Sequence, residues 1–572
     1  MVECEQVSHG DGGYKKPQLS AKFTGARPAG PPVENRDMTL APPPTLPPTL
    51  PLTCRRADLL ARLAAPHTYD LAVIGGGATG LGVALEAAAQ GHSVVLLESH
   101  DFAKGTSSRA TKLVHGGVRY LAQGNLSLVR EALHERAVLL KNAPHIARPL
   151  AFVMPSYRFW EAPFYGFGLK VYDLLAGAAG LGRTEFLSRA QTLDLLPGAE
   201  PEGLKGGVKY WDGQFDDARL ALALARTAAL KGALLLNYCP VTGLIHEGGQ
   251  LAGLHARDQE SGRTFEIRAR CIVNAAGVWV DQLRQLDAQA AGSTATPMVA
   301  PSQGVHLVVD QSFWPGENAL LVPKTRDGRV LFAVPWLGKL ILGTTDTPRE
   351  DLAREPLAFQ EEVDFILRES ARYLRRAPQA ADVLSVWVGL RPLVRPLQSG
   401  DGRTQGLSRE HTVLVSQSGL VTVTGGKWTP SRAMAADVLA HCQQAGRLPA
   451  GAPSPTASLP LVGAQTGAHS LTQAPGLHSY GSEAAYVQSL PGAERWLCPG
   501  LSLAMVRFAA RHEYARTVED VLARRSRLLF LDARLAESVA GEVASVLQEE
   551  TGTDPGLAAF LAISRQYQSL PA

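Results

Sequence analysis

The fold is decided by the stretch Tyr69-Asp70-Leu71-Ala72-Val73-Ile74-Gly75-Gly76-Gly77-Ala78-Thr79-Gly80. Within it, Leu71–Ile74 is a short apolar run with β-branched residues, which is typical of a buried parallel strand. Gly75, Gly77 and Gly80 follow in the pattern G-x-G-x-x-G. The first glycine permits a tight turn, the second lets the backbone approach a pyrophosphate, and the third lets helix and strand pack closely. The stretch therefore predicts a strand, a phosphate-binding turn and the start of a helix.

The residues after the turn complete a βαβ unit. Leu81–Gln90 is rich in alanine and predicts a helix whose first N–H groups face the phosphates, and Gly91 ends it. Ser93–Leu97 predicts a second strand, followed by Glu98 at 23 positions after the first glycine. An acid about 20 positions on binds the ribose hydroxyls in dinucleotide folds, so NAD or FAD fits better than NADP. A P-loop is excluded because no Lys-Ser or Lys-Thr follows the glycines.

Length and composition set the broad class. The 572 residues allow two or three domains, and 45% hydrophobic with 19% charged residues is an ordinary globular balance. A net charge of +3 is too near neutral to indicate a nucleic-acid partner. The six cysteines are scattered without a C-x-x-C pair, so we expect a reducing compartment, no disulfide framework and no metal site. No run approaches the ~18 apolar residues of a membrane-spanning helix.

The chain predicts an α/β fold in several parts. Residues 1–66, with their proline clusters, predict a disordered tail. Residues 67–440 alternate strands and helices, which predicts a Rossmann-like FAD-binding domain interleaved with a mainly β substrate domain. Residues 441–480 are rich in Pro, Gly, Ser and Thr and predict a linker. Residues 481–572 predict a C-terminal α-helical domain, with Leu531, Leu535, Val539, Val543 and Leu547 on one helix face.

Two further stretches have an expected place. Arg270–Gly277 is a second strand-to-glycine turn, and we expect its strand to join the sheet beside the first motif. The basic stretch Arg524-Arg525-Ser526-Arg527 predicts a solvated face, with a membrane-surface role as the alternative.

Several polar residues on glycine-punctuated loops are candidates for chemistry. His115 lies between the loop after the second strand and a glycine pair, which places it near the cofactor. Asp346 follows an apolar strand, and Arg391, Arg409 and Lys427 lie on later loops. Several such cations suit a small anionic substrate, because Arg binds phosphate bidentately and Lys acts as a point charge.

With these motifs, the chain resembles the FAD-dependent glycerol-3-phosphate dehydrogenases, the respiratory flavoenzymes of glycerol catabolism. The most specific matches are His115-Gly116-Gly117-Val118-Arg119-Tyr120-Leu121 and Gly425-Gly426-Lys427-Trp428-Thr429. The other matching segments are Ile74–Gly80, Thr106–Ser108 with Lys112, Tyr210–Arg219, Val273–Trp279, Gly343–Asp346, Gly389–Leu393 and, in the C-terminal domain, Arg511–Arg516. One departure is Pro430-Ser431-Arg432, where the family continues with Thr-Tyr-Arg.

The resemblance implies an enzyme that oxidises sn-glycerol 3-phosphate to dihydroxyacetone phosphate by hydride transfer to FAD. It implies a membrane quinone as the electron acceptor, with a homodimer as one option for the assembly. The EF-hand extension of the mitochondrial members is missing, so we expect a bacterial-type enzyme in the cytoplasm, peripheral on the inner face of the cytoplasmic membrane. Two alternatives stay open: an oxidase of the same substrate that uses O2, and an FAD-dependent amino-acid oxidase of related fold.

The resemblance also implies roles for individual residues. We expect His115 to be the catalytic base and Arg391 to stabilise the developing C2 oxyanion. The expected FAD-binding residues are Gly75, Gly77, Gly80, Glu98, Thr106, Ser107, Ser108, Ala276, Gly277, Gly426, Lys427 and Thr429. The expected substrate-binding residues are Arg119, Tyr120, Arg409 and Lys427, which together with Arg391 would form the phosphate site.

Overall fold

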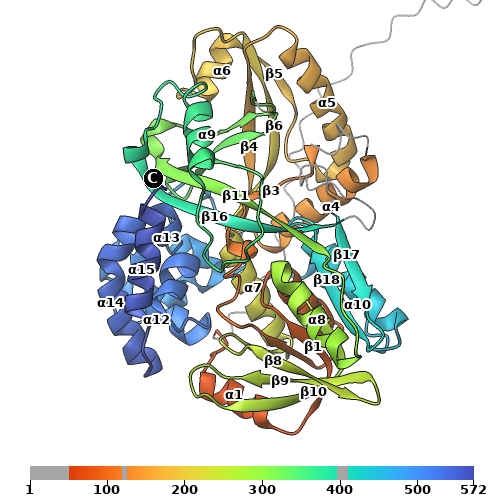
Figure 1. The fold of residues 1–572 in the computed structure, drawn as a ribbon. Coiled ribbons are helices and arrows are strands. Elements are labelled where there is room, and N and C mark those ends of the chain that lie inside the picture. The colour runs from red at the N-terminus through yellow and green to blue at the C-terminus, as the bar shows by residue number, and fades with distance from the viewer. Residues whose placement is uncertain (1–50, 119–124, 327, 396–409, 572) are drawn as a thin grey trace, which may run out of the picture. The chain divides into compact units, whose positions relative to one another are not determined.

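The computed structural model describes residues 51–118, 125–326, 328–395 and 410–571 (Figure 1). The described part falls within a unit spanning residues 43–572. Among the described residues, no helix has both the length and the apolar content needed to cross a membrane.

Helix α1 (Arg56–Ala64) forms inside the stretch that the sequence predicts as a disordered tail. Leu60 and Leu63 are buried, and the helix contacts strands β7 (Leu234–Leu236) and β10 (Thr264–Asn274). Arg56 is buried as well, and its Nε donates to Asp258 Oδ1 at 3.0 Å. The end of the predicted tail therefore belongs to the folded body, because its leucines share one helical face.

The first sheet is built on the predicted βαβ unit. Its strands are β1 (Thr68–Ile74), β2 (Val94–Leu97), β7, β8 (Val241–Glu247), β9 (Gln250–Arg257), β10, β17 (His411–Val415) and β18 (Leu420–Gly425). The main path runs in the order β17-β18-β10-β1-β2-β7, and all its pairs are parallel except β17–β18. Val73 pairs with Val273, so the strand of the second glycine turn lies beside β1 as predicted.

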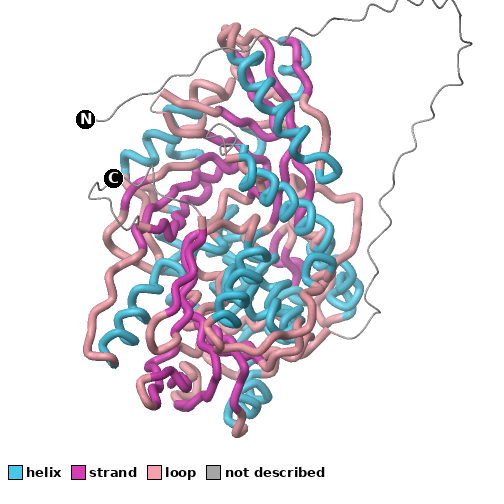
Figure 2. Tube along the Cα trace, turned by 90° about the vertical axis from the view of Figure 1, so that its right-hand side faces the viewer, coloured by secondary structure: helices cyan, strands magenta, loops and turns pink. Residues whose placement is uncertain are grey.

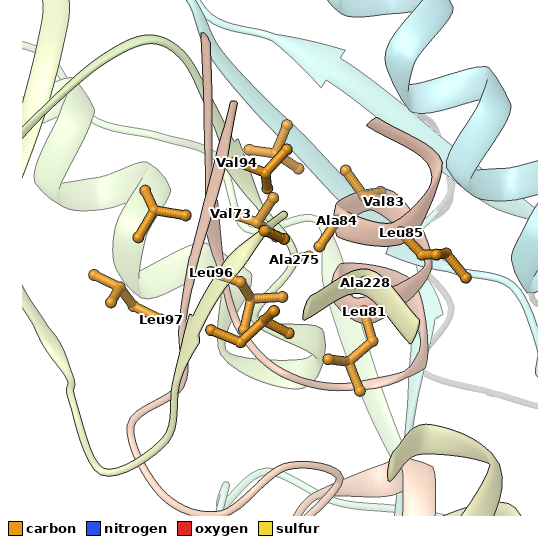
Figure 3. Packing of buried hydrophobic residues seen from close by; sticks show 14 of the residues in the cluster. Val73, Leu81, Val83, Ala84, Leu85, Val94, Leu96, Leu97, Ala228 and Ala275 are labelled. Carbon is orange, nitrogen blue, oxygen red and sulfur yellow. The ribbon is translucent and has the colours of Figure 1, made fainter. Parts of the chain in front are cut away.

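Helices cover this sheet. They are α2 (Ala78–Ala89), α7 (Asp217–Leu230), α8 (Val280–Ala290) and α10 (Ser431–Gln444). Helix α2 contacts α7, α10 and the strands β1 and β2, and its residues from Gly80 to Ala88 are all buried, including the polar Glu86. Figure 3 shows the packing of Val73 and Leu96 from the strands with Leu81 from α2.

A second, ten-stranded sheet is interleaved with the first, as expected for a mainly β substrate domain. Its strands are β3 (Leu113–Val114), β4 (Ala147–Ser156), β5 (Glu185–Ser188), β6 (Gly206–Phe215), β11 (Val299–Asp310), β12 (Ala319–Val322), β13 (Leu331–Trp336), β14 (Lys339–Gly343), β15 (Thr347–Pro348) and β16 (Val383–Val394). The helices α4 (Leu126–Asn142), α5 (Glu161–Ala176), α6 (Arg189–Leu195) and α9 (Gln360–Ser370) pack against it. Figure 2 shows helices against the strands of both sheets.

The C-terminal part is helical, as predicted. Its elements are α11 (Ala484–Ser489), the short strands β19 (Trp496–Cys498) and β20 (Leu501–Ser502), α12 (Leu503–His512), a π-helical turn (Asp520–Arg525), α13 (Leu528–Leu531), α14 (Ala533–Thr551) and α15 (Leu557–Gln568). Val539, Val543 and Leu547 are buried on one face of α14, whereas Leu535 is only half-buried and Leu531 lies in the separate helix α13, because the chain is extended at Asp532. The Asp532 side chain caps this helix by accepting from Leu535 N at 3.0 Å.

The segment 441–480, predicted as a linker, starts inside α10 and then follows the surface of the body through defined contacts. Leu461 N donates to Asn142 O at 2.9 Å, and Leu337 N donates to Leu471 O at 2.7 Å. Leu461 and Leu471 are themselves buried. These contacts attach the segment to the end of α4 and to the residue that follows β13.

Candidate active site

The glycine turn between β1 and α2 leaves no room for side chains. Gly75 has φ +107°, and a Cβ there would lie 2.6 Å from Ala275 O. A Cβ at Gly80 would lie 1.9 Å from Gly75 O. Gly77 is the N-cap of α2 and has no capping side chain, while Ala78 N donates to Ser107 Oγ at 2.9 Å. No side chain of the three motif glycines therefore stands between the backbone of the turn and a ligand at the N-terminus of α2, which suits a pyrophosphate.

Glu98 lies at the carboxyl end of β2, directly beside this turn. Its Oε2 accepts from Gly76 N at 2.6 Å, and its Oε1 accepts from His100 N at 2.9 Å. These bonds fix the carboxylate next to the glycine turn, where dinucleotide folds bind the ribose.

One large cavity, of about 1280 Å³, brings the predicted segments together. The predicted residues that line it are Gly75, Gly77, Glu98, Thr106, Ser107, His115, Ala276, Gly277, Arg391, Gly426, Lys427 and Thr429. Gly80 acts behind the lining by letting α2 approach the turn. Ser108 is buried behind the lining, and its carbonyl accepts from Lys112 Nζ at 2.8 Å. Arg119, Tyr120 and Arg409 lie outside the described residues.

The loop after β2 is held against the far side of the cavity. Thr106 Oγ1 donates to Leu390 O at 2.6 Å. Trp428 Nε1 donates to Ser107 O at 2.9 Å, so the segment around Lys427 is fastened to the same loop. Segments from three distant parts of the chain thus form a continuous wall.

Arg391 is oriented by a set of acceptors on neighbouring strands. Its Nη1 donates to Gln303 O at 3.0 Å, and its Nη2 donates to Thr345 O at 2.9 Å. Asp346 lies 3.4 Å from Nη1 and accepts a hydrogen bond from Ser302 Oγ. Because the guanidinium is fixed before any substrate enters, it needs little reorganisation to stabilise negative charge.

His306 is a cavity residue that the sequence analysis missed. Its Nε2 lies 3.0 Å from Thr111 Oγ1, and its ring stacks on Trp387 with centroids 4.1 Å apart. Burial, together with the charges of Lys112 and Arg391, holds the pKa of His306 well below its usual value, so the ring is neutral. It lies in an apolar strand and belongs to no recognised motif, so the sequence offered no signal for it.

Lys112 is fully buried behind this wall. Its Nζ lies 2.7 Å from Asp217 Oδ2 and 4.7 Å from the centroid of the Trp387 ring. Burial lowers the pKa of Lys112 to about 7, although the Asp217 carboxylate works in the opposite direction. The same lysine therefore supports both the loop that precedes His115 and the ring on which His306 stacks.

At the end of the cavity near Glu98, Arg354 and Trp279 form a second pair that the sequence analysis did not assign. The Arg354 guanidinium carbon lies 3.7 Å from the centroid of the Trp279 ring, and Trp279 Nε1 donates to Leu352 O at 3.2 Å. Both residues line the cavity. The Arg354 guanidinium, stacked on the Trp279 ring, places a positive charge in the cavity lining near Glu98.

These features fit FAD. The cradle around Gly75 and Gly80 would be filled by any Cβ, a carboxylate lies at the ribose position, and the cavity continues from there to His115 and Arg391. The arrangement can bind a dinucleotide along one wall and a small anion at the other end.

Comparison with known proteins gives the same result. Residues 70–438 match the family model described as FAD dependent oxidoreductase, and residues 454–556 match the C-terminal domain of alpha-glycerophosphate oxidase. The mitochondrial glycerol-3-phosphate dehydrogenase of Mus musculus is 39% identical over 534 residues, covering 87% of this chain and 72% of that protein. The mitochondrial enzyme of Schizosaccharomyces pombe is 36% identical over 581 residues, covering 90% and 88%.

A solved structure agrees with these matches. The glycerol-3-phosphate dehydrogenase from Bacillus halodurans, complexed with FAD, superposes with a TM-score of 0.71 at 30% identity, covering 90% of this chain and 98% of that one. The expected cofactor and family are thereby confirmed. The chain belongs to the FAD-dependent oxidoreductases and, among them, to the glycerol-3-phosphate dehydrogenase family.

Proposed function

We propose that this flavoenzyme oxidises glycerol 3-phosphate to dihydroxyacetone phosphate and passes the electrons to a membrane quinone. The observation that carries the proposal is the cavity that joins the dinucleotide turn at Gly75 to the loops of His115 and Lys427 and to Arg391, which lies on strand β16 and not on a loop as the sequence predicted. The names of the relatives supply the substrate, and the cavity supplies a place where a phosphorylated alcohol meets the flavin.

FAD, when bound, supplies the acceptor for the hydride that leaves C2 of the substrate. The residues that would hold it are Gly75, Gly77 and Glu98 at one end, and Thr106 and Lys427 farther along the cavity. Gly80 contributes by allowing α2 to bring its N-terminus to the pyrophosphate.

His115 and Arg391 are the proposed catalytic pair. His115 removes the proton from the C2 hydroxyl, since a ring nitrogen of neutral imidazole can accept a proton. Arg391 stabilises the negative charge that develops on the C2 oxygen, and its fixed orientation makes that stabilisation efficient.

The phosphate is the handle that orients the substrate. Lys427 lines the cavity and supplies a point charge for it. Arg119, Tyr120 and Arg409, which lie outside the described residues, are the other proposed contacts, on sequence grounds. Binding remote from C2 holds the reacting atoms in place, and such orientation is worth several kcal/mol.

Anaerobic mixing of the FAD-loaded protein with glycerol 3-phosphate tests the reaction. We expect the flavin absorbance to bleach within the turnover time, and glycine or a D-amino acid to leave it unchanged. Bleaching by an amino acid and not by glycerol 3-phosphate would overturn the assignment.

Exposed apolar side chains on and just before helix α5 support the proposal that the protein works at a membrane surface. Phe167 and Leu174 on this helix and Phe159 just before it are 73%, 80% and 83% exposed. An exposed row of Phe and Leu on one helix is typical of a face that lies in a bilayer interface. Phe164 and Phe167 also line the cavity, so the helix brings the cavity beside the proposed membrane face, where a quinone is dissolved.

A flotation experiment tests this face. With vesicles of phosphatidylcholine and phosphatidylglycerol we expect the parent protein to float, and Phe159→Ser/Leu174→Ser to float several-fold less, because two large apolar side chains are lost. Leu230→Ser, which changes an exposed leucine on α7, is the matched control and should float like the parent. A parent that stays with the protein fraction, or a double variant that floats equally, would contradict the proposal.

Oxygen is the second candidate acceptor, because the match over residues 454–556 is to a domain described from an oxidase. Turnover with a short-chain quinone under nitrogen favours the dehydrogenase. Stoichiometric release of hydrogen peroxide in air, without turnover on quinone, would establish the oxidase instead.

A further inference from the structure

A buried hydrogen-bond network lies directly beneath the turn that carries His115. Its centre is Asp212 on β6, which is 2% exposed. Asp212 Oδ1 accepts from Gly116 N at 3.1 Å and from Arg136 Nη1 at 2.9 Å. Asp212 Oδ2 accepts from Tyr172 Oη at 3.1 Å. One carboxylate thus joins the His115 turn to α4, which contributes Arg136, and to α5, which contributes Tyr172.

The turn is pressed onto this network. A Cβ at Gly116 would lie 2.2 Å from Tyr172 Oη and 2.5 Å from Leu133 Cδ2, so the backbone at 116 touches the phenol itself. The peptide group between His115 and Gly116 is held from its other side as well, because the His115 carbonyl accepts from Thr429 Oγ1 at 3.3 Å. The main chain of His115 is therefore clamped between Thr429 and Asp212, and this clamp sets the direction in which the imidazole leaves the backbone.

The network has the properties of a rigid support. Tyr172 and Arg136 are both buried to 1% exposure, and Arg136 Nη2 is anchored on Ala179 O at 2.9 Å. Burial raises the pKa of the Asp212 carboxyl, while the Arg136 charge and the hydrogen bonds from Arg136, Gly116 and Tyr172 oppose that rise. Donors from Gly116, Arg136 and Tyr172 hold the Asp212 carboxylate, although Arg136 Nε has no hydrogen-bond partner among the described residues, and a buried polar network of this kind favours one geometry for the groups that it holds.

We propose that Asp212, held by Tyr172 and Arg136, is a positioning residue for His115. The inference rests on the proposed function, in which His115 is the base. Asp212 does not itself move the proton; it fixes the turn from which His115 reaches the C2 hydroxyl. A misplacement of about 1 Å at a reacting group costs roughly a hundredfold in rate, so the support is expected to matter for the rate of reduction and little for binding.

Tyr172→Phe is the gentlest test, because it keeps the ring and removes only the hydroxyl that donates to Asp212. In anaerobic stopped flow we expect the rate of flavin reduction by glycerol 3-phosphate to fall roughly ten- to a hundredfold. We expect the substrate concentration at half-maximal rate and the FAD affinity to stay within threefold of the parent. Asp212→Asn should show the same split with a larger loss of rate. Tyr157→Phe is the matched control, since Tyr157 Oη donates to Glu200 O at 2.8 Å, away from the turn, and it should reduce flavin at the parent rate.

A double-mutant cycle separates positioning from a general structural role. In a His115→Ala background, Tyr172→Phe should cause no further loss, because the group that it positions is gone. Equal losses by Tyr172→Phe in both backgrounds would overturn the inference, as would an unchanged rate in both Tyr172→Phe and Asp212→Asn. If His115→Ala itself keeps the parent rate, the proposed base fails instead, so the two failures are distinguishable.

Discussion

Gly80→Ala is expected to weaken FAD binding, and the structure sets the size of the effect. The new Cβ would lie 1.9 Å from Gly75 O, about 1.5 Å closer than an ordinary contact of 3.4 Å. The Gly75 oxygen belongs to the backbone and the new Cβ is bonded directly to it, so no flexible side chain can move aside to relieve the clash. Either α2 or the glycine turn has to move, and the two together form the proposed pyrophosphate site.

The cost of such overpacking is about 1–3 kcal/mol. If the free protein relaxes by opening the turn, binding must close it again, and FAD affinity falls by roughly 5- to 150-fold. Gly82→Ala is the matched control on the same helix. Its Cβ would lie 3.4 Å from Ser431 O and 3.5 Å from Ala435 Cβ, which is ordinary contact, and alanine is favoured over glycine in a helix by about 1 kcal/mol.

Fluorescence titration of the apoprotein with FAD measures the affinity, and circular dichroism checks that each variant is folded. We expect Gly82→Ala to bind FAD like the parent and Gly80→Ala to bind it at least fivefold more weakly. A folded Gly80→Ala that binds FAD within threefold of the parent would refute the reasoning, because the close approach at this turn would then be dispensable.

Three further changes have defined outcomes. Arg391→Lys replaces the planar fork with a point charge, so kcat/KM for glycerol 3-phosphate should fall roughly a hundredfold in steady-state assays, and a change below threefold would contradict its role. Glu98→Gln weakens the bond from Gly76 N and removes the acid from the ribose position, so FAD affinity should fall about tenfold in the same titration, whereas unchanged affinity would place the ribose elsewhere. Although burial opposes it, the charges of Arg524 and Lys104 hold the pKa of Glu519 below its usual 4.5. The stability from this carboxylate is therefore present above pH 4.5 and is lost as the pH falls through the lower pKa of the folded state. In urea unfolding measured as a function of pH, Glu519→Gln should make the free energy of unfolding fall less steeply below pH 4.5 than in the parent. An unchanged pH dependence would argue against this role of Glu519.

The fold was predictable where local sequence decides the structure. The run from Tyr69 to Glu98 specifies strand, turn, helix, strand and acid by spacing alone, and β1, α2 and β2 follow it closely. For the same reason Val539, Val543 and Leu547 of the predicted helix face were placed correctly on α14, but the extended residue Asp532 separates Leu531 from that helix. By contrast, α1 was missed because the composition of the proline-rich residues before it dominated the interpretation of the whole N-terminal stretch.

The site was predictable only where residues stand in motifs. Residues in the glycine turn and around Lys427 line the cavity, as their motifs indicated. His306 was missed because a histidine in an apolar strand looks like any core residue, and its contact with Thr111 joins residues 195 positions apart. Asp212 was quoted in a motif, but its contact with Gly116 joins strands that are neighbours only after folding. Contacts between residues so far apart in the chain produce no repeating pattern that a single sequence could reveal.

The basic stretch Arg524–Arg527 shows how far charge alone can mislead. It was predicted to be a solvated face, yet Arg525 and Arg527 are buried. Arg525 Nη2 donates to Asp101 Oδ1 at 3.0 Å, and Arg527 Nη2 donates to Asp217 Oδ1 at 3.1 Å and to Ser108 O at 2.7 Å. The partners lie on the loop after β2 and at the start of α7, more than 300 positions away in sequence.

These contacts give the C-terminal helices a part in the flavin site. Among the described residues the cavity wall ends at Thr429, so the C-terminal helices act from behind it. Lys104 Nζ lies 2.6 Å from Glu519, and Arg527 Nη2 donates to Ser108 O. The C-terminal part therefore contacts the loop that carries Thr106 and Ser107 at both of its ends. Removing one member of a buried ion pair leaves an uncompensated charge and costs several kcal/mol, so we expect the loss of Glu519 to disturb this loop. The loop that closes the cofactor wall therefore takes part of its shape from C-terminal helices whose described residues do not line the cavity.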